Sequence, residues 1–218
     1  MIYHDDIAAC NEYAQDSAEN LKRCALFVVA TIQQQLETVP VILTGFVSEG
    51  GGSKYAWGFK SNSIEYLDAN YCELYRDAMR AKDKPGKLLA VFLRVPGFGI
   101  VKAGFLAQIF ANQTGCIDVH NVTLYGVPMS ALRYTKKCKA KTLREKRAQY
   151  IDLCAGLGGS AELWSRWCDY VAAMRPNNWA NGSEVSRFHV DVITGLETGA
   201  IIDLFTGIDI DPTFLQAA

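Results

Sequence analysis

The chain has 218 residues, of which 50% are hydrophobic and 11% aromatic, and its formal net charge is −1. This length and apolar content suit one large or two small, intimately packed globular units with an ample core. No run approaches the roughly 18 uncharged apolar residues of a membrane span. The acidic start, M-I-Y-H-D-D, lacks the basic region of a signal peptide. A net charge near zero also argues against a protein coated in positive charge.

The cysteines and histidines predict no metal site. The seven cysteines are odd in number and scattered, and no two have the C-x-x-C spacing of a zinc or iron–sulfur site. We expect reduced, mostly buried thiols in a cytoplasmic protein. His4, His120 and His189 are far apart and lack ligand partners at helical spacing. We therefore expect neither a metal nor a cofactor.

The first quarter of the chain combines helical and ambiguous stretches. Apolar residues recur at three- and four-residue steps over 5–37, which predicts one long or broken helix that stops before Pro40. Residues 41–47 are apolar and β-branched, and suit a short strand or a buried helical turn. The glycines and alternate aromatics of 48–59 predict a loop. It is either a hairpin with one buried face or a mobile segment that presents Tyr55 and Trp57 to a ligand.

Next come a long helix, a short helix, a glycine turn and a further helix. Residues 63–81 read as a helix with Ser63 as its N-cap, and K-D-K-P-G ends it. Residues 87–93 form a short apolar helix that leads into V-P-G-F-G. The apolar run 102–110 comes directly after this turn and predicts a second helix.

The turn itself, within 94–121, has the chemistry of an anion site. Pro96 fixes φ, while Gly97 and Gly99 can adopt backbone angles closed to other residues. A glycine turn that feeds a helix leaves N–H groups of the first turn without intrahelical partners, at the positive end of the helix dipole. Such a turn predicts a phosphate-binding site. About twenty residues further on stand a carboxylate and an imidazole, Asp118 and His120.

The segment V-P-G-F-G, the small residue Ala103 in the following helix and then I-D-V-H resemble the helix-hairpin-helix DNA glycosylases. The resemblance covers residues 94–121. It implies a mostly α, all-helical fold with the active cleft between two helical subdomains. By position, Asp118 would be the catalytic carboxylate. The amides around Gly97, Gly99 and Val101 would grip a DNA phosphate, and His120 would touch a phosphate beside the flipped nucleotide.

Two positions depart from the family pattern. Bifunctional members carry a nucleophilic lysine where this chain has Val101, and Lys102 lies one position further, about 100° round the helix. The departure implies monofunctional base excision, with Lys102 as a catalytic candidate for residual lyase activity only. Asn121 stands where the family usually shows an arginine or a hydrophobic pair.

A basic segment begins twelve residues after the D-V-H-N element. Eight of the 22 basic residues lie in 133–147, against the single acid Glu145. Such a run is either a solvated face or a surface for the DNA backbone, and the nearby hairpin favours the second. The DNA-binding candidates here are Lys136, Lys137, Lys139 and Lys141. Tyr55 and Trp57 are the candidates for a base pocket or wedge, because an extruded base needs a ring to stack on it or fill its gap.

The C-terminal part contains one competing motif. Residues 151–159, I-D-L-C-A-G-L-G-G, are similar to the first motif of cytosine-5 DNA methyltransferases. Only 59 residues follow Gly159, too few for the rest of that fold, so a corner between two helices is the preferred reading. Helices are then expected to about Arg175 and over 183–194, with a loop at 176–182. The tail, 195–218, suits a packed helix or a partly loose end.

The sequence divides into an N-terminal helical segment with the glycine–aromatic loop (1–62), a hairpin module (63–130) and a basic segment with C-terminal helices (131–218). We expect a monomer that acts on double-stranded DNA in the cytoplasm, that of the host if a phage encodes it, without a membrane. Three functions stay open: a base-excising glycosylase, a DNA-binding module without catalysis, and a glycosylase-like transferase that modifies a thymine derivative, as proposed for small phages. The target base is not readable from these residues.

Overall fold

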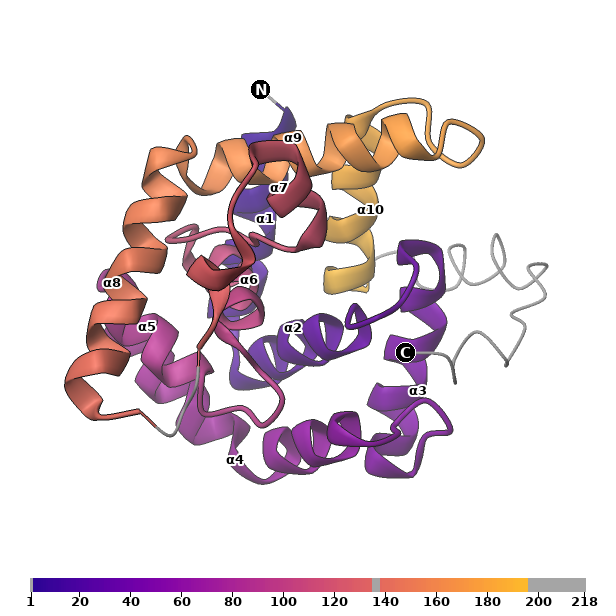
Figure 1. The fold of residues 1–218 in the computed structure, drawn as a ribbon. Coiled ribbons are helices and arrows are strands. Elements are labelled where there is room, and N and C mark those ends of the chain that lie inside the picture. The colour runs from indigo at the N-terminus through magenta and orange to yellow at the C-terminus, as the bar shows by residue number, and fades with distance from the viewer. Residues whose placement is uncertain (1, 135–137, 196–218) are drawn as a thin grey trace.

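The computed structural model describes residues 2–134 and 138–195, and within them the chain forms ten α-helices and no strand (Figure 1). The mostly α fold class is therefore confirmed. The helices are α1 (Ile2–Asp16), α2 (Ala18–Ala30), α3 (Val39–Glu49), α4 (Phe59–Ala81), α5 (Pro85–Phe92), α6 (Ile100–Ala111), α7 (Val119–Tyr125), α8 (Ala140–Gly156), α9 (Gly159–Met174) and α10 (Gly182–Thr194). Short 3₁₀ turns lie at Leu36–Thr38, Gly50–Gly52 and Met129–Leu132.

The helical segment expected over 5–37 is broken into two helices, which was one of the two alternatives. Ser17 separates α1 from α2, and its side-chain oxygen accepts a hydrogen bond from the N–H of Asn20 at 3.1 Å. This contact caps α2, which ends at Ala30 rather than near residue 37. Pro40 does not follow a helix but stands in the first turn of α3, where its missing N–H costs nothing. The apolar run 41–47 is therefore helical, and the strand alternative was wrong.

The segment 48–59 forms no β-hairpin. Gly50–Gly52 make a 3₁₀ turn, and α4 begins at Phe59 with Gly58 as its N-cap. Ser63 thus lies inside α4, which corrects its expected role as N-cap. Its hydroxyl instead lies 2.9 Å from the carbonyl of Phe59 and 2.7 Å from that of Pro96, so it joins α4 to the turn before α6.

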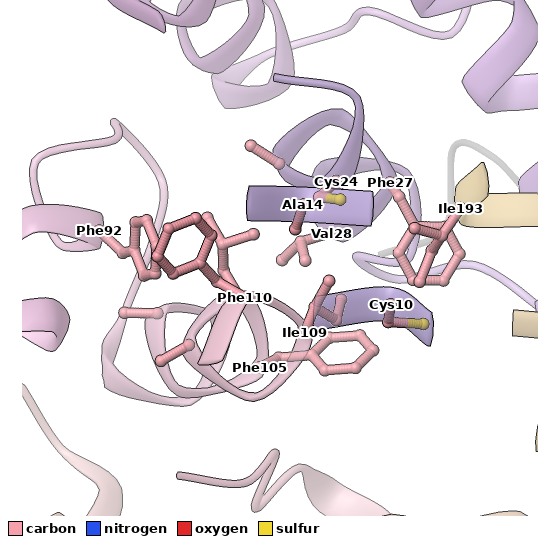
Figure 2. Close-up of a cluster of buried hydrophobic side chains, with 14 of the residues drawn as sticks. Cys10, Ala14, Cys24, Phe27, Val28, Phe92, Phe105, Ile109, Phe110 and Ile193 are labelled. Atoms are coloured by element: carbon pink, nitrogen blue, oxygen red, sulfur yellow. The ribbon is translucent and has the colours of Figure 1, made fainter. Parts of the chain in front are cut away.

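Helix α6 lies in the middle of the molecule, and α1, α2 and α5 pack against it (Figure 1). Its apolar side chains meet those of α1 and α2 in the cluster of Figure 2. Phe110 packs edge-on against Phe92 of α5 at 5.7 Å, and Phe105 against Phe27 of α2 at 6.0 Å. Gly104 lets α8 approach closely, because a Cβ there would lie 2.7 Å from the hydroxyl of Tyr150. The whole buried cluster draws on residues from Ile7 to Ile193.

The glycines of 156–159 form a corner between two helices. Helix α8 ends at Gly156, and Gly158 and Gly159 have φ of +103° and +82° where α9 begins. The residues before this corner are helical, so the strand that a methyltransferase motif requires is not there. Asn181 caps α10, because its side-chain oxygen accepts a 3.2 Å hydrogen bond from the N–H of Glu184.

An ion pair joins the 3₁₀ turn before α3 to the C-terminal end of α9. Glu37 is almost fully buried, and the Arg175 guanidinium lies 2.7 Å from its carboxylate, with the amide of Asn178 also at 2.7 Å. Burial raises the pKa of Glu37, but hydrogen bonds from its backbone, Asn178 and Arg175 outweigh it, so the pKa lies below its ordinary value. No helix in the described ranges is both long and apolar enough to cross a membrane.

Candidate active site around Asp118

The predicted turn joins α5 to α6 through residues 93–99. The N–H of Phe98 donates to the carbonyl of Val95 at 3.2 Å, and Gly97 has a φ of +77°, which only glycine adopts at little cost. Gly99 is the N-cap of α6, with the N–H of Ala103 donating to its carbonyl at 3.0 Å. A Cβ built at Gly99 would meet nothing within 4 Å. The start of α6 is therefore open for a ligand to approach its backbone, as the sequence predicts, and Val101 lies partly buried in its first turn.

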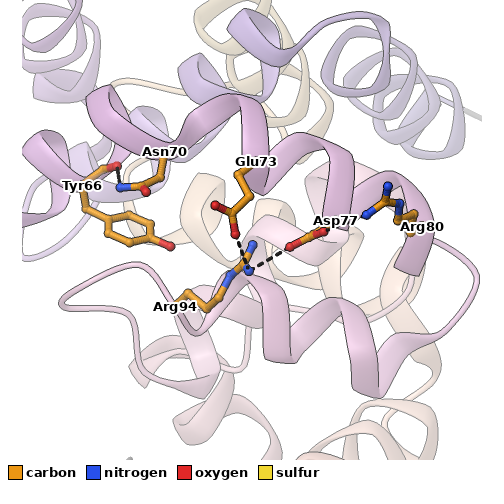
Figure 3. A network of polar contacts seen from close by, with 6 residues as sticks. All are labelled: Tyr66, Asn70, Glu73, Asp77, Arg80 and Arg94. Carbon is orange, nitrogen blue, oxygen red and sulfur yellow. Dashed lines mark hydrogen bonds and ion pairs between the residues drawn. The ribbon is translucent and has the colours of Figure 1, made fainter.

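Side chains of α4 hold this turn in place. The Arg94 guanidinium lies 2.8 Å from the carboxylate of Asp77 and 3.3 Å from that of Glu73 (Figure 3). Together with the bond from Ser63 to the Pro96 carbonyl, these contacts fix both ends of the turn against α4. Arg94 thus has a structural partner in the chain itself, although it stands beside the candidate phosphate site.

We expect Gly97→Ala to lower the free energy of unfolding by about 1–3 kcal/mol, because alanine is strained at this φ. The added Cβ would also lie 2.8 Å from Cδ2 of Phe59. Thermal unfolding measures the loss. Gly99→Ala is the matched control, since Gly99 has an ordinary φ of −85° and free space, and we expect it to change stability by less than about 1 kcal/mol. Equal losses in the two variants would contradict this assignment.

The loop between α6 and α7 is clamped from three sides. The Tyr150 hydroxyl donates to the carbonyl of Gly115 at 2.7 Å and lies 3.3 Å from the N–H of Ile117. The amide of Gln108 accepts from the N–H of Cys116 at 3.3 Å, and the amide of Asn121 donates to the Cys116 carbonyl at 2.5 Å. Asn121, one of the departures from the family pattern, therefore holds the backbone that leads to Asp118.

Asp118 lies at the start of α7 with both carboxylate oxygens engaged. Oδ1 accepts from the N–H of Asn121 at 3.1 Å, and the Asp118 carbonyl accepts from the N–H of Val122 at 2.8 Å, which is the geometry of an N-cap. Oδ2 accepts from Nε1 of Trp167, on α9, at 3.2 Å. These contacts fix the carboxylate of a residue that is, as a whole, only partly buried.

An aromatic cluster backs Trp167. The ring of His189 lies 4.8 Å from that of Trp167 and 5.2 Å from that of Trp164, which in turn lies 6.4 Å from Phe105 of α6. Nδ1 of His189 donates to the Val185 carbonyl at 2.7 Å, whereas Nε2 has no partner among the described residues. Burial lowers the pKa of His189 to about 4, so this ring is neutral at physiological pH.

Two lysines lie near the turn, Lys102 and Lys60. Only Lys102 was a candidate site residue from the sequence. Lys102 extends from the first turn of α6 toward α2, with Nζ 3.4 Å from Oγ1 of Thr31 and 5.8 Å from the ring centre of Phe105. Lys60, in the first turn of α4, is fully buried. Burial and then the positive charge of Lys102 lower the pKa of Lys60 to about 8. Burial and then the charge of Asp118 raise the pKa of the Cys116 thiol, whereas the charge of Lys102 lowers it.

The other predicted site residues lie at several separate places in the structure. Trp57 lies beside the lysines, with its ring centre 5.5 Å from Nζ of Lys60, whereas Tyr55 contacts Lys54 at 5.1 Å. Lys139 and Lys141 are exposed at the start of α8, and Lys141 lies only 4.0 Å from Glu145. Lys136 and Lys137, the side chain of His120 and the tail beyond 195 lie outside the described residues.

Sequence reasoning missed Trp167 and Lys60, since neither belongs to the motif and each reaches the site by long-range packing. Among the described residues, no three histidines, cysteines or acids are grouped so that they could hold a metal ion. Comparison of the chain with protein-family models, with curated proteins and with solved structures gave no match. Inference about function therefore depends on the motif and on this geometry.

Proposed function

We propose that this chain is a DNA glycosylase-like enzyme that flips a base out of duplex DNA and acts on it with Asp118, most simply by monofunctional excision. The observation that carries the proposal is the fixed carboxylate of the partly buried Asp118, in a clamped loop that follows the helix after the glycine hairpin. The base would enter a cleft between the N-terminal and C-terminal helices, as in the resembling family.

Capping alone does not account for Asp118. An N-cap needs one carboxylate oxygen, and Oδ1 fills that role. Oδ2 is bound by a tryptophan from α9, and an arrangement that orients a carboxylate from two sides is what a positioned catalytic group requires. The non-catalytic alternative, a module that only grips phosphates, does not require this second contact on the carboxylate.

The chemistry follows from the charge of Asp118. As the N-glycosidic bond breaks, positive charge develops on the sugar, and a carboxylate near it stabilises that charge or deprotonates an attacking water. The amides around Gly97 and Gly99 would hold a backbone phosphate in the meantime. Val101 has no amine, and Lys102 is turned toward Thr31, so we expect no Schiff base and no strand cleavage.

The deciding experiment incubates the wild type with duplexes that carry thymine, uracil, 5-hydroxymethyluracil, 8-oxoguanine or an alkylated base. Each product is read by intact mass and by alkali-induced cleavage. A released base with an alkali-labile site supports excision, and strand scission without alkali would contradict the monofunctional assignment. Tight, salt-sensitive binding without any product would leave the binding module alone.

One observation favours a second reaction, the transfer of an amine or amino acid to an activated hydroxymethyl group on a thymine derivative. Lys60 and Lys102 bring two positive charges together near the turn before α6, more than the loss of a neutral base requires. A leaving group gains negative charge as its C–O bond breaks, and two ammonium groups would stabilise it. In the incubation with the modified duplexes, this function leaves the DNA backbone intact. It gives a base of higher mass only when the amine or amino acid is added.

The exposed lysines at the start of α8 are assigned to the DNA backbone. We expect Lys139→Ala with Lys141→Ala to weaken duplex binding equally for all sequences. The negative slope of log K against log salt should become less steep by about 1 to 2, because each lost phosphate contact removes about 0.9 from its magnitude. Fluorescence anisotropy at four salt concentrations measures this slope. Arg80→Ala, which removes an exposed charge at the end of α4, is the control and should leave it unchanged.

A further inference from the structure

Lys60 is a buried positive charge without compensation. Its side chain has no exposed surface, and Nζ, which has three hydrogens to donate, has no hydrogen-bond acceptor among the described residues. The ring centre of Trp57 lies 5.5 Å from Nζ, and a methionine would pack against that ring equally well. A buried ammonium normally has an acceptor or a carboxylate, because its desolvation is costly. The missing partner of Lys60 therefore points to something outside the chain.

Lys102 adds a second charge at the same place. It lies close enough to Lys60 to lower its pKa. Nζ of Lys102 lies at the C-terminal end of α2, where Thr31 and the negative end of the helix dipole stabilise it. No such dipole compensates Lys60. Two like charges side by side raise the free energy of the empty site and favour the binding of an anion.

The two lysines stand at the open N-termini of two helices. Lys60 is the second residue of α4 and Lys102 the third of α6, and neither helix has an acid in its first turn. The N-cap of each is a glycine, Gly58 or Gly99, around which a Cβ would meet nothing within 4 Å. The N-terminal ends of these two helix dipoles therefore add positive charge near the backbone of both lysines.

We infer that Lys60 and Lys102, with the first turns of α4 and α6, form a binding site for a phosphate group. Lys102 is partly exposed and makes the first contact, while direct contact with the fully buried Lys60 requires the side chains around it to rearrange. The phosphate comes either from the DNA backbone or from a phosphorylated small molecule, since the recognition chemistry is the same. The inference concerns binding alone and does not rest on the reaction proposed for Asp118.

The test is isothermal titration of the whole chain with inorganic phosphate at constant ionic strength, for the wild type, Lys60→Met and Lys102→Met. Lys87→Met is the matched control, because Lys87 is likewise the third residue of its helix but is exposed at the start of α5. We expect each of the two site variants to lose phosphate affinity at least tenfold and the control to keep it. Lys60→Arg retains the charge and should retain binding. Circular dichroism checks that Lys60→Met folds. If it does not fold, the phosphate affinity of Lys102→Met alone tests the inference.

A second titration in the presence of saturating duplex DNA separates the two sources. Loss of phosphate binding when DNA is bound, with weaker DNA binding by both site variants, assigns the site to a backbone phosphate. Phosphate binding that persists on the DNA complex assigns it to a small-molecule phosphate. The inference is overturned if the wild type binds no phosphate, or if Lys102→Met binds it as tightly as Lys87→Met does.

Discussion

Asp118→Asn is expected to lower the rate of base release, or of base modification, by about 10²–10⁴-fold, the range for loss of a positioned acid–base group. Asparagine still caps α7, because its side-chain oxygen can accept from the N–H of Asn121, so the fold and DNA affinity should change little. It carries no negative charge, however, and cannot stabilise a cationic sugar or take a proton. Single-turnover kinetics on the duplex that gives product with the wild type measures the change.

Trp167→Phe is the companion variant, since it removes the hydrogen bond to Oδ2 but leaves the carboxylate in place. We expect a rate loss of about tenfold, with unchanged DNA affinity, because the tryptophan only positions Asp118. Full activity in Asp118→Asn would reduce Asp118 to a helix cap and would remove the basis for either enzyme. A loss of DNA affinity parallel to the loss of rate would indicate that the variant perturbs the hairpin instead.

The hairpin was predictable because its signals are local. Pro96, Gly97 and Gly99 restrict or extend the backbone angles of their own positions, and such restrictions act whatever surrounds them. The structure accordingly has a positive φ at Gly97 and a helix that begins after Gly99. The same holds for the corner at Gly158, where two successive glycines end one helix and begin another.

Predictions failed where tertiary packing decides between local alternatives. The apolar run 41–47 suited either a short strand or a buried helical turn, and packing against α2 selects the helix α3, with Pro40 in its first turn. Ser63 has the chemistry of an N-cap, yet α4 begins four residues earlier, and the hydroxyl serves the turn at Pro96. Trp167 and Lys60 reach the candidate site from α9 and α4, and no spacing in the sequence brings either of them to residues 94–121.

Lys60→Met is expected to make the protein more stable at neutral pH. The pKa of Lys60 falls from 10.5 to about 8 on folding, chiefly through burial and then through the charge of Lys102, which corresponds to a penalty of about 3 kcal/mol for keeping the amine protonated. Between these two pH values the unfolded chain holds a proton that the folded chain has released. The free energy of unfolding of the wild type should therefore rise with pH across that window, while below pH 8 the full penalty remains.

Methionine has a similar length and no charge, so Lys60→Met should gain about 1–3 kcal/mol at pH 7, less the lost contact with the ring of Trp57. This gain should shrink toward pH 10.5. Urea unfolding of both proteins from pH 7 to 10 measures it, and only the difference between them counts, because buried groups such as Cys154 also titrate in or near this range. Lys87→Met should show no gain. A variant that is less stable than the wild type at pH 7 would show that the Lys60 ammonium is a stabilising core group. A stable variant that no longer binds phosphate would instead show that the fold accepts a destabilising charge for the sake of a ligand.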